Sequence, residues 1–208
     1  MSFDVAVRRQ LGRAEIAVDF RVEEGLTVLF GPSGVGKTSV LNMIAGLLRP
    51  DAGHVRVGGV PLFDAAAGID VVPERRRIGY VFQDGRLFPH LRVRANLLYG
   101  WRLARAEDRW IGLDEAVAFL GIGHLLDRWP RSLSGGEAQR VAIGRALLSG
   151  ARTLLMDEPL ASLDAARRAE ILTVIERVRD DLRLPILYVT HDVREAERLA
   201  TRRVELGA

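Results

Sequence analysis

The stretch GPSGVGKT, residues 31–38, has the residue types and spacing that most directly predict chemistry. It matches the pattern G-x-x-x-x-G-K-[ST] at every required position, after an apolar run and before a helical pattern. Its glycines let the backbone curl so that consecutive N–H groups face inward, and the following helix adds its positive N-terminus. The sequence therefore predicts a polyphosphate cradle formed by Gly31, Pro32, Ser33, Gly34, Val35, Gly36, Lys37, Thr38 and Ser39.

Lys37 is distinctive because it is the single lysine in a chain with 30 lysine and arginine residues. We expect its compact ammonium group to contact the β- and γ-phosphates, where the planar guanidinium of arginine is less suitable. We expect the Thr38 hydroxyl to ligate Mg²⁺. A glycine-rich turn without function is a much weaker alternative, so the pattern predicts ATP with Mg²⁺ as the bound group.

Two adjacent carboxylates, Asp157 and Glu158, end the apolar run TLLMDE. An apolar run of this length predicts a buried strand, and α/β folds bind their ligands at the carboxyl ends of such strands. We expect Asp157 to hold Mg²⁺, often through water, and Glu158 to polarise an attacking water. An ordinary acidic strand end is a common alternative, but the cradle upstream favours the functional interpretation.

The stretch LSGGE, residues 133–137, opens a predicted helix with two glycines, which disfavour a first turn by roughly 1 kcal/mol each. Ser134 and Glu137 have the spacing of a capping box, which explains the serine and glutamate but leaves Gly135 and Gly136 unexplained. Without a Cβ, the two glycines expose backbone amides to a second phosphate chain. The simplest hypothesis is a head-to-tail dimer in which this helix start contacts a nucleotide held by the second copy.

The elements that must position these residues follow from the hydrophobic pattern. Continuous apolar runs at 26–30, 153–157 and 185–190 predict a central parallel sheet that is covered on both faces. Alternation at 14–23 and a strand with a turn at 54–63 predict a more exposed β portion. Helices are predicted at about 37–48, 165–183 and 193–200, and residues 94–150 lack strand signal and predict a helical subdomain.

Composition limits the class of protein. With 208 residues, 48% hydrophobic and 27% charged, the chain is expected to form one globular domain, and its apolar runs are too short to cross a bilayer. The absence of cysteine excludes disulfides and thiolate metal sites. The net charge is +3, but the arginines are scattered among acids, so a solvated surface is favoured and no nucleic-acid partner is expected.

The order GPSGVGKT, YVFQD, LSGGE, LLMDEP, SLD and VTHD resembles the nucleotide-binding subunit of ABC transporters over nearly the whole chain. The resemblance implies an α/β fold: a P-loop NTPase core with a mostly parallel central sheet, an N-terminal antiparallel β portion and a helical subdomain at about 94–150. It implies a single nucleotide-binding domain, residues 1–208.

The resemblance also implies roles for matching residues. Gln83 would contact Mg²⁺ and link the site to a membrane partner, and His191 would contact the γ-phosphate. Glu158 would be the general base. Three residues, Ser134, Gly135 and Gly136, would contact the opposite subunit's ATP. Asp164 would lie in the loop that crosses the dimer interface.

The partners that the resemblance implies are a second nucleotide-binding subunit, transmembrane permease subunits and, indirectly, a periplasmic or extracellular solute-binding protein. The expected location is the cytoplasmic face of the cell membrane, as a peripheral subunit. Residues 84–99 would contact a cytoplasmic helix of the permease. The alternative, that Leu87, Phe88, Leu91 and Val93 are ordinary core residues, is equally favoured.

Within the family, residues 75–100 and 121–148 are most similar to the ATPase subunit of molybdate importers. An importer of sulfate or another oxyanion is an alternative. Such subunits usually carry a C-terminal oxyanion-binding domain, and we expect this domain to be absent or removed because the chain stops at Ala208.

Other classes of ATPase fit less well. A chromosome-maintenance or repair ATPase acting on nucleic acid would place a long coiled coil between the cradle and LSGGE, where no sustained heptads occur. A translation-associated relative would usually carry two cassettes, and a small-molecule kinase would not need LSGGE.

One family feature is missing. Residues 8–13 read RRQLGR, where most members have an aromatic residue that stacks on adenine. Either an arginine plane stacks on the base instead, or base recognition is loose. We therefore predict weak discrimination between ATP and GTP.

Overall fold

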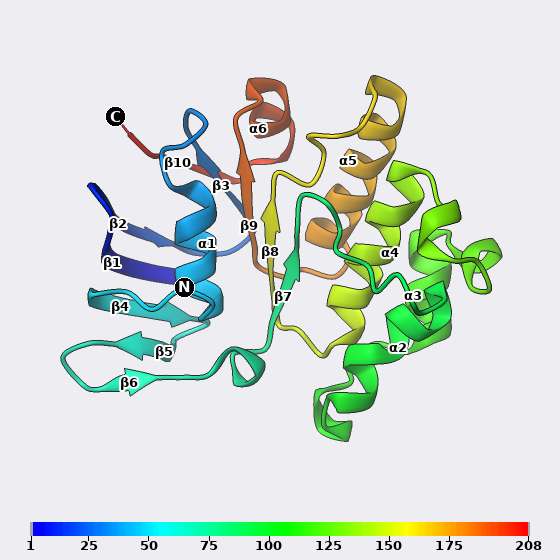
Figure 1. Ribbon diagram of the computed structural model, residues 1–208, viewed down its shortest axis with the longest axis horizontal. Helices are drawn as coiled ribbons and strands as arrows, with labels where there is room; N and C mark the ends of the chain where they lie inside the picture. The colour runs from blue at the N-terminus through cyan, green and yellow to red at the C-terminus, as the bar shows by residue number, and fades with distance from the viewer. Residues whose placement is uncertain (1, 208) are drawn as a thin grey trace.

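Two five-stranded sheets and a group of helices make up the computed structural model, which describes residues 2–207. The antiparallel sheet, helix α1 (Lys37–Ala45), the parallel sheet and most of the remaining helices follow one another across the molecule (Figure 1). The predicted α/β class, with a parallel central sheet and an N-terminal antiparallel part, is confirmed.

The antiparallel sheet has the order β2-β1-β4-β5-β6. Its strands are β1 (Phe3–Leu11), β2 (Ala14–Val22), β4 (Ala52–Val57), β5 (Val60–Asp64) and β6 (Ile69–Asp70). In β2, buried and exposed residues alternate, with Ile16, Val18, Phe20 and Val22 facing inward. Because an antiparallel sheet can leave one face in water, this alternation matches its position at the side of the molecule.

The second sheet has the order β10-β3-β9-β8-β7, and every neighbouring pair is parallel. The strands are β10 (Arg202–Glu205), β3 (Leu26–Phe30), β9 (Ile186–Thr190), β8 (Thr153–Asp157) and β7 (Ile78–Val81). Every residue of β8 and β9 is buried, which explains why these strands read as continuous apolar runs.

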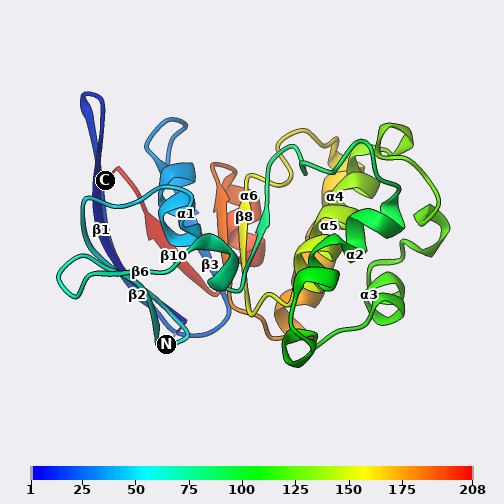
Figure 2. The same ribbon diagram turned by 60° about the horizontal axis from the view of Figure 1, so that its bottom comes forward.

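Two hydrophobic cores lie on the two faces of the parallel sheet. One core joins α1 with the antiparallel sheet and includes Leu41, Leu155 and Leu187. The other joins the opposite face of the parallel sheet with the helices, and includes Leu147, Met156 and Ile175. Figure 2 shows α1 and α4 on opposite sides of β8.

The helices of the second core are α2 (Val93–Leu103), α3 (Leu113–Leu120), α4 (Gly135–Leu148), α5 (Ala165–Asp180) and α6 (Val193–Leu199). Short 3-10 turns occur at Pro73–Arg75, Ala106–Asp108, Gly123–Leu125 and Pro130–Ser132. Three of these helices, α2, α3 and α4, come from the stretch in which the sequence predicts helices and no strands.

The structure differs from the prediction at several boundaries. Helix α1 ends at Ala45 because Gly46 takes a left-handed conformation with φ 81° and the Arg76 guanidinium donates to the carbonyl oxygens of Met43 and Ile44. The predicted strand at 54–63 is a hairpin of two strands, β4 and β5. Sequence analysis missed β1, β7 and β10. The alternation of β1 stops at Val7, where the polar residues Arg8, Arg9 and Gln10 follow, and β7 and β10 are only four residues long.

Candidate functional site

Four segments of the candidate site come together because parallel strands place their carboxyl ends at one sheet edge. The cradle follows β3, Gln83 follows β7, Glu158 follows β8 and His191 follows β9. In Figure 1 these strand ends share the upper edge of the parallel sheet. This is the edge at which α/β folds bind their ligands.

The cradle has the backbone curvature that the sequence predicts at two of its glycines. Gly34 and Gly36 have φ values of 84° and 102°, a region that side chains with a Cβ rarely adopt. The prediction that Gly31 is needed for backbone curvature is wrong, because Gly31 is not among the residues with positive φ. A Cβ there would lie 2.6 Å from the carbonyl oxygen of Leu206, so close backbone approach excludes a side chain.

Lys37 is the first residue of α1 and its side chain is buried. Its Nζ donates to the carbonyl oxygens of Gly31 at 2.8 Å and Pro32 at 2.9 Å, and lies 3.7 Å from Oε1 of Glu158. The ammonium group is therefore held inside the loop, where a phosphate oxygen can replace these partners.

Thr38 and Asp157 lie together as predicted for a shared metal site. The Thr38 hydroxyl donates to Oδ1 of Asp157 at 3.0 Å, and the Tyr80 hydroxyl lies 3.4 Å from Oδ2. Burial raises the pKa of Asp157, and the neighbouring charge of Glu158 raises it further. Burial also raises the pKa of Tyr80, so its hydroxyl remains a neutral donor.

This donor set fits Mg²⁺. Magnesium prefers oxygen ligands and is usually bound by one or two protein groups together with waters and phosphate oxygens. No group of three or more His, Cys, Asp or Glu residues that could hold a metal occurs within residues 2–207. A hydroxyl and one carboxylate beside a phosphate cradle therefore suit a metal that is bound with a nucleotide.

Glu158 has an unusual backbone conformation, with φ 42°, in the left-handed region. For a residue with a side chain this costs free energy and persists only where the surroundings enforce it. Its Oε2 lies 3.0 Å from Nδ1 of His191, and Glu158 N donates to the carbonyl oxygen of Val189 at 3.1 Å. The side chain of His191 is 53% exposed, so the pair faces solvent at the sheet edge.

Gln83 is exposed at the same edge. The loop that follows it is fixed from two helices. Arg145 of α4 donates to the carbonyl oxygens of Gly85 and Arg86 at 2.9 and 2.7 Å. Asn96 of α2 accepts from Phe88 N at 2.8 Å and donates to the carbonyl oxygen of Leu91 at 2.9 Å.

The tip of α4, formed by Ser134, Gly135 and Gly136, has the predicted capping box. Ser134 N donates to Oε2 of Glu137 at 2.7 Å, and Glu137 N donates to Oγ of Ser134 at 3.3 Å. Gly135 is exposed, but Gly136 is buried, and a Cβ added to it would lie 3.6 Å from Cβ of Arg167. The expectation that both glycines are uncovered is therefore wrong for Gly136.

The tip of α4 is not brought to the cradle of its own chain. Figures 1 and 2 agree that α1 and α4 lie on opposite sides of the parallel sheet. A pocket of about 310 Å³ beside the tip is lined by residues of the helical part and α5, among them Arg140, Arg167 and Glu170, and by no cradle residue. Asp164 lies nearby as the N-cap of α5, accepting from Arg167 N at 2.9 Å.

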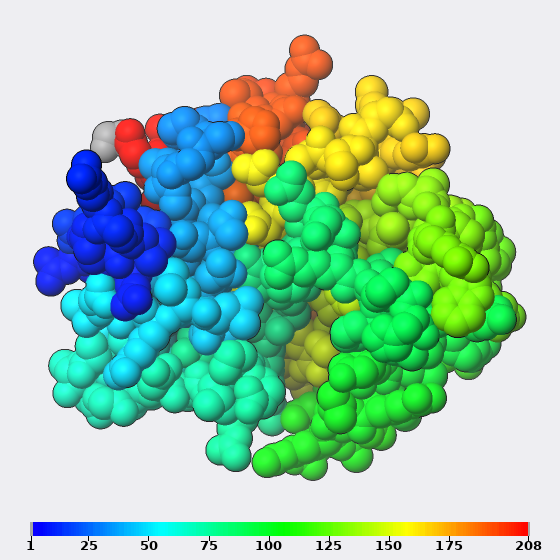
Figure 3. All heavy atoms as spheres, viewed as in Figure 1, coloured from blue at the N-terminus to red at the C-terminus, as the bar shows by residue number. Residues whose placement is uncertain are grey.

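Residues 84–99 are partly core and partly surface. Val93 is fully buried, whereas Leu87, Phe88 and Leu91 are partly exposed. The Phe88 ring lies 4.5 Å from that of the exposed Tyr99. Figure 3 shows this green segment on the visible face, between the earlier and later parts of the chain.

Residues 8–13, which lack the adenine-stacking aromatic residue, contain two arginines that form ion pairs. Arg8 lies 3.5 Å from Glu15, and Arg9 pairs with Asp51. Ile16 of the same hairpin packs against the cradle, since a Cβ on Gly36 would lie 2.9 Å from its Cδ1.

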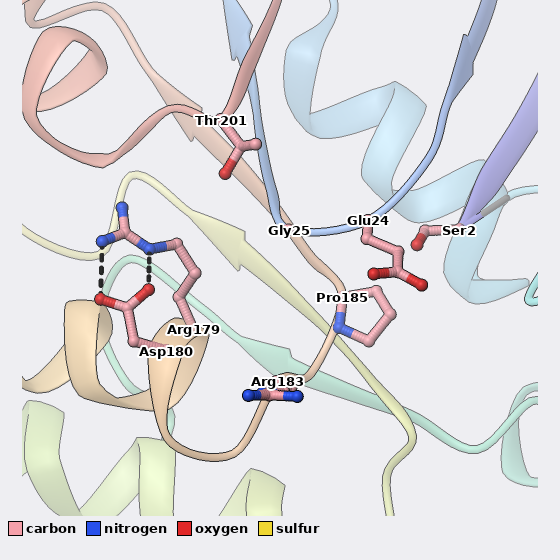
Figure 4. Close-up of a pocket in the computed structure, with 8 residues that line it drawn as sticks. All are labelled: Ser2, Glu24, Gly25, Arg179, Asp180, Arg183, Pro185 and Thr201. Atoms are coloured by element: carbon pink, nitrogen blue, oxygen red, sulfur yellow. Dashed lines mark hydrogen bonds and ion pairs between the residues drawn. The ribbon is translucent and has the colours of Figure 1, made fainter.

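A pocket of about 640 Å³ lies elsewhere, at the amino ends of β3 and β9 (Figure 4). Glu24, Arg183 and Thr201 are among its lining residues, and Arg179 is paired with Asp180 there. It contains none of the predicted site residues. Because the predicted chemistry lies at the carboxyl ends of the strands, this pocket is not the candidate site.

Sequence analysis missed residues that support the site from a distance in the sequence. The hydroxyl of Tyr80, on β7, lies between Asp157 and helix α1. It is 3.2 Å from Oδ1 of Asn42 on α1 and 3.4 Å from Oδ2 of Asp157. Its position three residues before Gln83 is the only signal that could have drawn attention to it.

None of the helices within residues 2–207 combines the length and apolar character needed to cross a membrane.

Comparisons with known proteins agree with this geometry. Residues 17–161 match the family model described as "ABC transporter". The chain is 57% identical over 197 residues to a molybdenum import ATP-binding protein, ModC, of Rhodospirillum rubrum, covering 95% of this chain and 53% of that protein. It is also 57% identical to ModC of Brucella abortus, covering 98% and 56%. The chain thus spans about half the length of these curated relatives.

The fold is similar to the dimeric structure of MJ0796, a bacterial ABC transporter cassette. The TM-score is 0.77 and the sequence identity 27%, with 99% of this chain and 93% of that chain covered.

Proposed function

The chain belongs to the ABC transporter family, and on this premise we propose that it is the ATP-hydrolysing subunit of a molybdate importer. In this proposal residues 1–208 form one nucleotide-binding domain. Two copies close head to tail around two ATP molecules, and a separate transmembrane permease converts the closure into transport.

One observation carries the proposal: the groups suited to phosphate chemistry form two separate sets in one chain. Lys37, Glu158 and His191 lie together at the sheet edge, and the tip of α4 lies on the other side of the parallel sheet. A helix start that exposes Gly135 and is capped by Ser134 suits a phosphate chain. The second copy's cradle supplies that chain.

Each group in the cradle has a distinct task. The phosphates are bound by Lys37 and by backbone N–H groups of residues 31–39 other than Pro32, which has none. Thr38, Gln83 and Asp157 would hold Mg²⁺, which neutralises charge on the phosphates. Glu158 orients a water and accepts its proton as the water oxygen bonds to the γ-phosphorus, while the bond to the ADP oxygen breaks. His191 contacts the γ-phosphate and holds Glu158.

The partner subunit completes this arrangement. Ser134 and Gly135 of one copy contact the nucleotide in the other, with Gly136 packed behind them near Arg167. Asp164 lies in the loop that crosses the interface. Phosphoryl transfer needs positioning and charge stabilisation more than covalent help, so assembly by closure ties hydrolysis to motion.

The loop after Gln83 is the proposed contact with the permease. Phe88 and Tyr99 form a partly exposed aromatic pair, and aromatic residues are enriched in protein interfaces. The subunit would therefore lie at the cytoplasmic face of the cell membrane, with a periplasmic or extracellular solute-binding protein acting indirectly through the permease.

Molybdate as the solute is supported by the 57% identity to two molybdenum import ATP-binding proteins. Solute choice belongs to the permease and its binding protein. The test is ATP hydrolysis by the subunit reconstituted with its copurified permease and binding protein. Molybdate should stimulate hydrolysis and enter the vesicles. Stimulation by sulfate but not molybdate, or by DNA or RNA, would contradict the proposal.

A further inference from the structure

A buried polar network lies directly behind His191 and contains groups that the proposed hydrolysis does not use. Glu195, on α6, is 4% exposed. One of its carboxylate oxygens accepts hydrogen bonds from the hydroxyls of Tyr188 and Thr190, both at 2.8 Å. Burial raises the pKa of Tyr188 well above its ordinary value, so its hydroxyl stays a neutral donor. The network therefore fixes the end of β9 against α6, with His191 between them.

Arg168 joins this network to helix α5. Its guanidinium NH1 donates to Oδ2 of Asp192 at 2.9 Å, and its Nε lies 3.7 Å from Oε1 of Glu195. Asp192 N in turn donates to Oγ1 of Thr190 at 3.0 Å. The residues on both sides of His191 are thus held by a group of contacts that includes Arg168.

Arg168 also lies one helical turn from the loop that precedes α5. Asp164 caps this helix, and Arg168 N donates to its carbonyl oxygen at 2.9 Å. A small cavity of about 70 Å³ is lined by Ala161 of the loop together with Arg168, His191 and Glu158. The loop, Arg168 and the pair Glu158–His191 therefore surround one cavity. A displacement of the loop can reach His191 through Arg168.

We infer that Arg168 is a positioning residue that transmits the docking of the second copy from residues 161–164 to His191, and through His191 to Glu158. This inference rests on the proposed function, because it requires the loop to meet a second copy. Arg168 N is hydrogen-bonded to the carbonyl oxygen of Asp164 in the first turn of α5, so movement at Asp164 moves Arg168. The ion pair to Asp192 carries that movement to the histidine.

The test uses the whole 208-residue chain with Arg168→Gln, Asp192→Asn and the double variant. We expect Arg168→Gln to lower kcat for ATP about tenfold, with little change in KM, because it misplaces groups without removing a binding contact. The two substitutions break one ion pair, so the double variant should be no slower than the slower single variant.

A second readout reports on the histidine itself. In histidine-labelled protein, a non-hydrolysable ATP analogue with Mg²⁺ should shift the imidazole resonance of His191 when dimers form. In Arg168→Gln the dimers should still form and this shift should be smaller, because His191 is no longer held in place against the γ-phosphate. Should Arg168→Gln fail to fold, Arg168→Lys keeps a charge near Asp192 and should give an intermediate kcat at unchanged KM.

Arg198→Gln is the matched control, because Arg198 pairs with Glu176 at 2.8 Å and ties the same two helices together away from His191. It should leave kcat and the His191 resonance unchanged. Equal losses of kcat in both variants, additive effects of Arg168→Gln and Asp192→Asn, or a resonance shift of unchanged size in Arg168→Gln would overturn the inference. Failure of the unsubstituted chain to hydrolyse ATP would instead overturn the proposed function.

Discussion

Lys37 Nζ lies 3.7 Å from Oε1 of Glu158, although the two residues belong to segments that follow different strands, β3 and β8. The cation proposed to bind phosphate and the carboxylate proposed to activate water are therefore already adjacent. Their tasks are different, and substitutions at the two positions should separate binding from turnover.

Replacing Lys37 by alanine should mainly weaken nucleotide binding, because the compact charge on the β- and γ-phosphates is lost. We expect the Kd for ATP to rise by about tenfold or more. Titration with a fluorescent ATP analogue measures it. Unchanged affinity would show that the cradle does not depend on its lysine.

Replacing Glu158 by glutamine should leave binding intact and lower turnover by about a hundredfold or more, as expected for loss of a general base. The variant should accumulate as a dimer with ATP and Mg²⁺, which size-exclusion chromatography can detect. Equal loss of binding in Glu158→Gln and Lys37→Ala would contradict the division of roles.

Base recognition should be weak, since residues 8–13 offer no aromatic ring and two of their arginines, Arg8 and Arg9, are paired with acids. We expect kcat/KM for ATP and GTP to differ by less than about tenfold. Competition assays with both nucleotides measure this ratio. A preference of about a hundredfold for ATP would show that another platform binds the base.

Stability should depend on pH through Asp4, a buried carboxylate on β1. The hydrogen bond from His54, 2.9 Å away, and the one from Arg21 lower the pKa of Asp4 from 3.8 to about 2. Because the pKa of Asp4 is lower in the folded than in the unfolded state, its ionisation stabilises the fold at pH values above the unfolded-state pKa. This contribution is lost as the pH falls through the folded-state pKa. The relevant window is therefore from about pH 4 down to about pH 2.

In urea unfolding at about pH 7, Asp4→Asn should lower the free energy of unfolding by about 1–2 kcal/mol. The difference from the unsubstituted chain should shrink as the pH falls through that window. Asp19→Asn, at an exposed position of the neighbouring strand β2, is the control and should change little. A difference that stays constant with pH would exclude the titration of Asp4 as its cause.

The local parts of the site were predictable from sequence because each is a short pattern with its own geometry. The cradle, the carboxylates at the end of β8 and the capping box at Ser134 all form within a few consecutive residues. The parallel sheet was predictable because β8 and β9 are buried on both faces and read as unbroken apolar runs.

The missing parts depend on contacts between distant segments. Gly31 is required because Leu206, at the far end of the chain, passes close to it. Arg168 and Tyr80 are supporting residues whose partners lie on other elements, and nothing in their neighbouring sequence marks them. Strand β7 has only four residues, too few for a pattern to stand out, and it pairs with β8 from a distant part of the chain.

The most direct test of the central claim, that each reaction centre is shared by two copies, is ATP turnover per chain across a dilution series, with the monomer fraction followed by sizing. We predict that turnover per chain falls in proportion to the dimer fraction. Ser134→Asp, which keeps a good helix cap but brings a negative charge to the partner's phosphates, should be inactive while still binding ATP. Ser134→Asn is its neutral control. Constant turnover by demonstrably monomeric chains, or full activity of Ser134→Asp, would contradict the account.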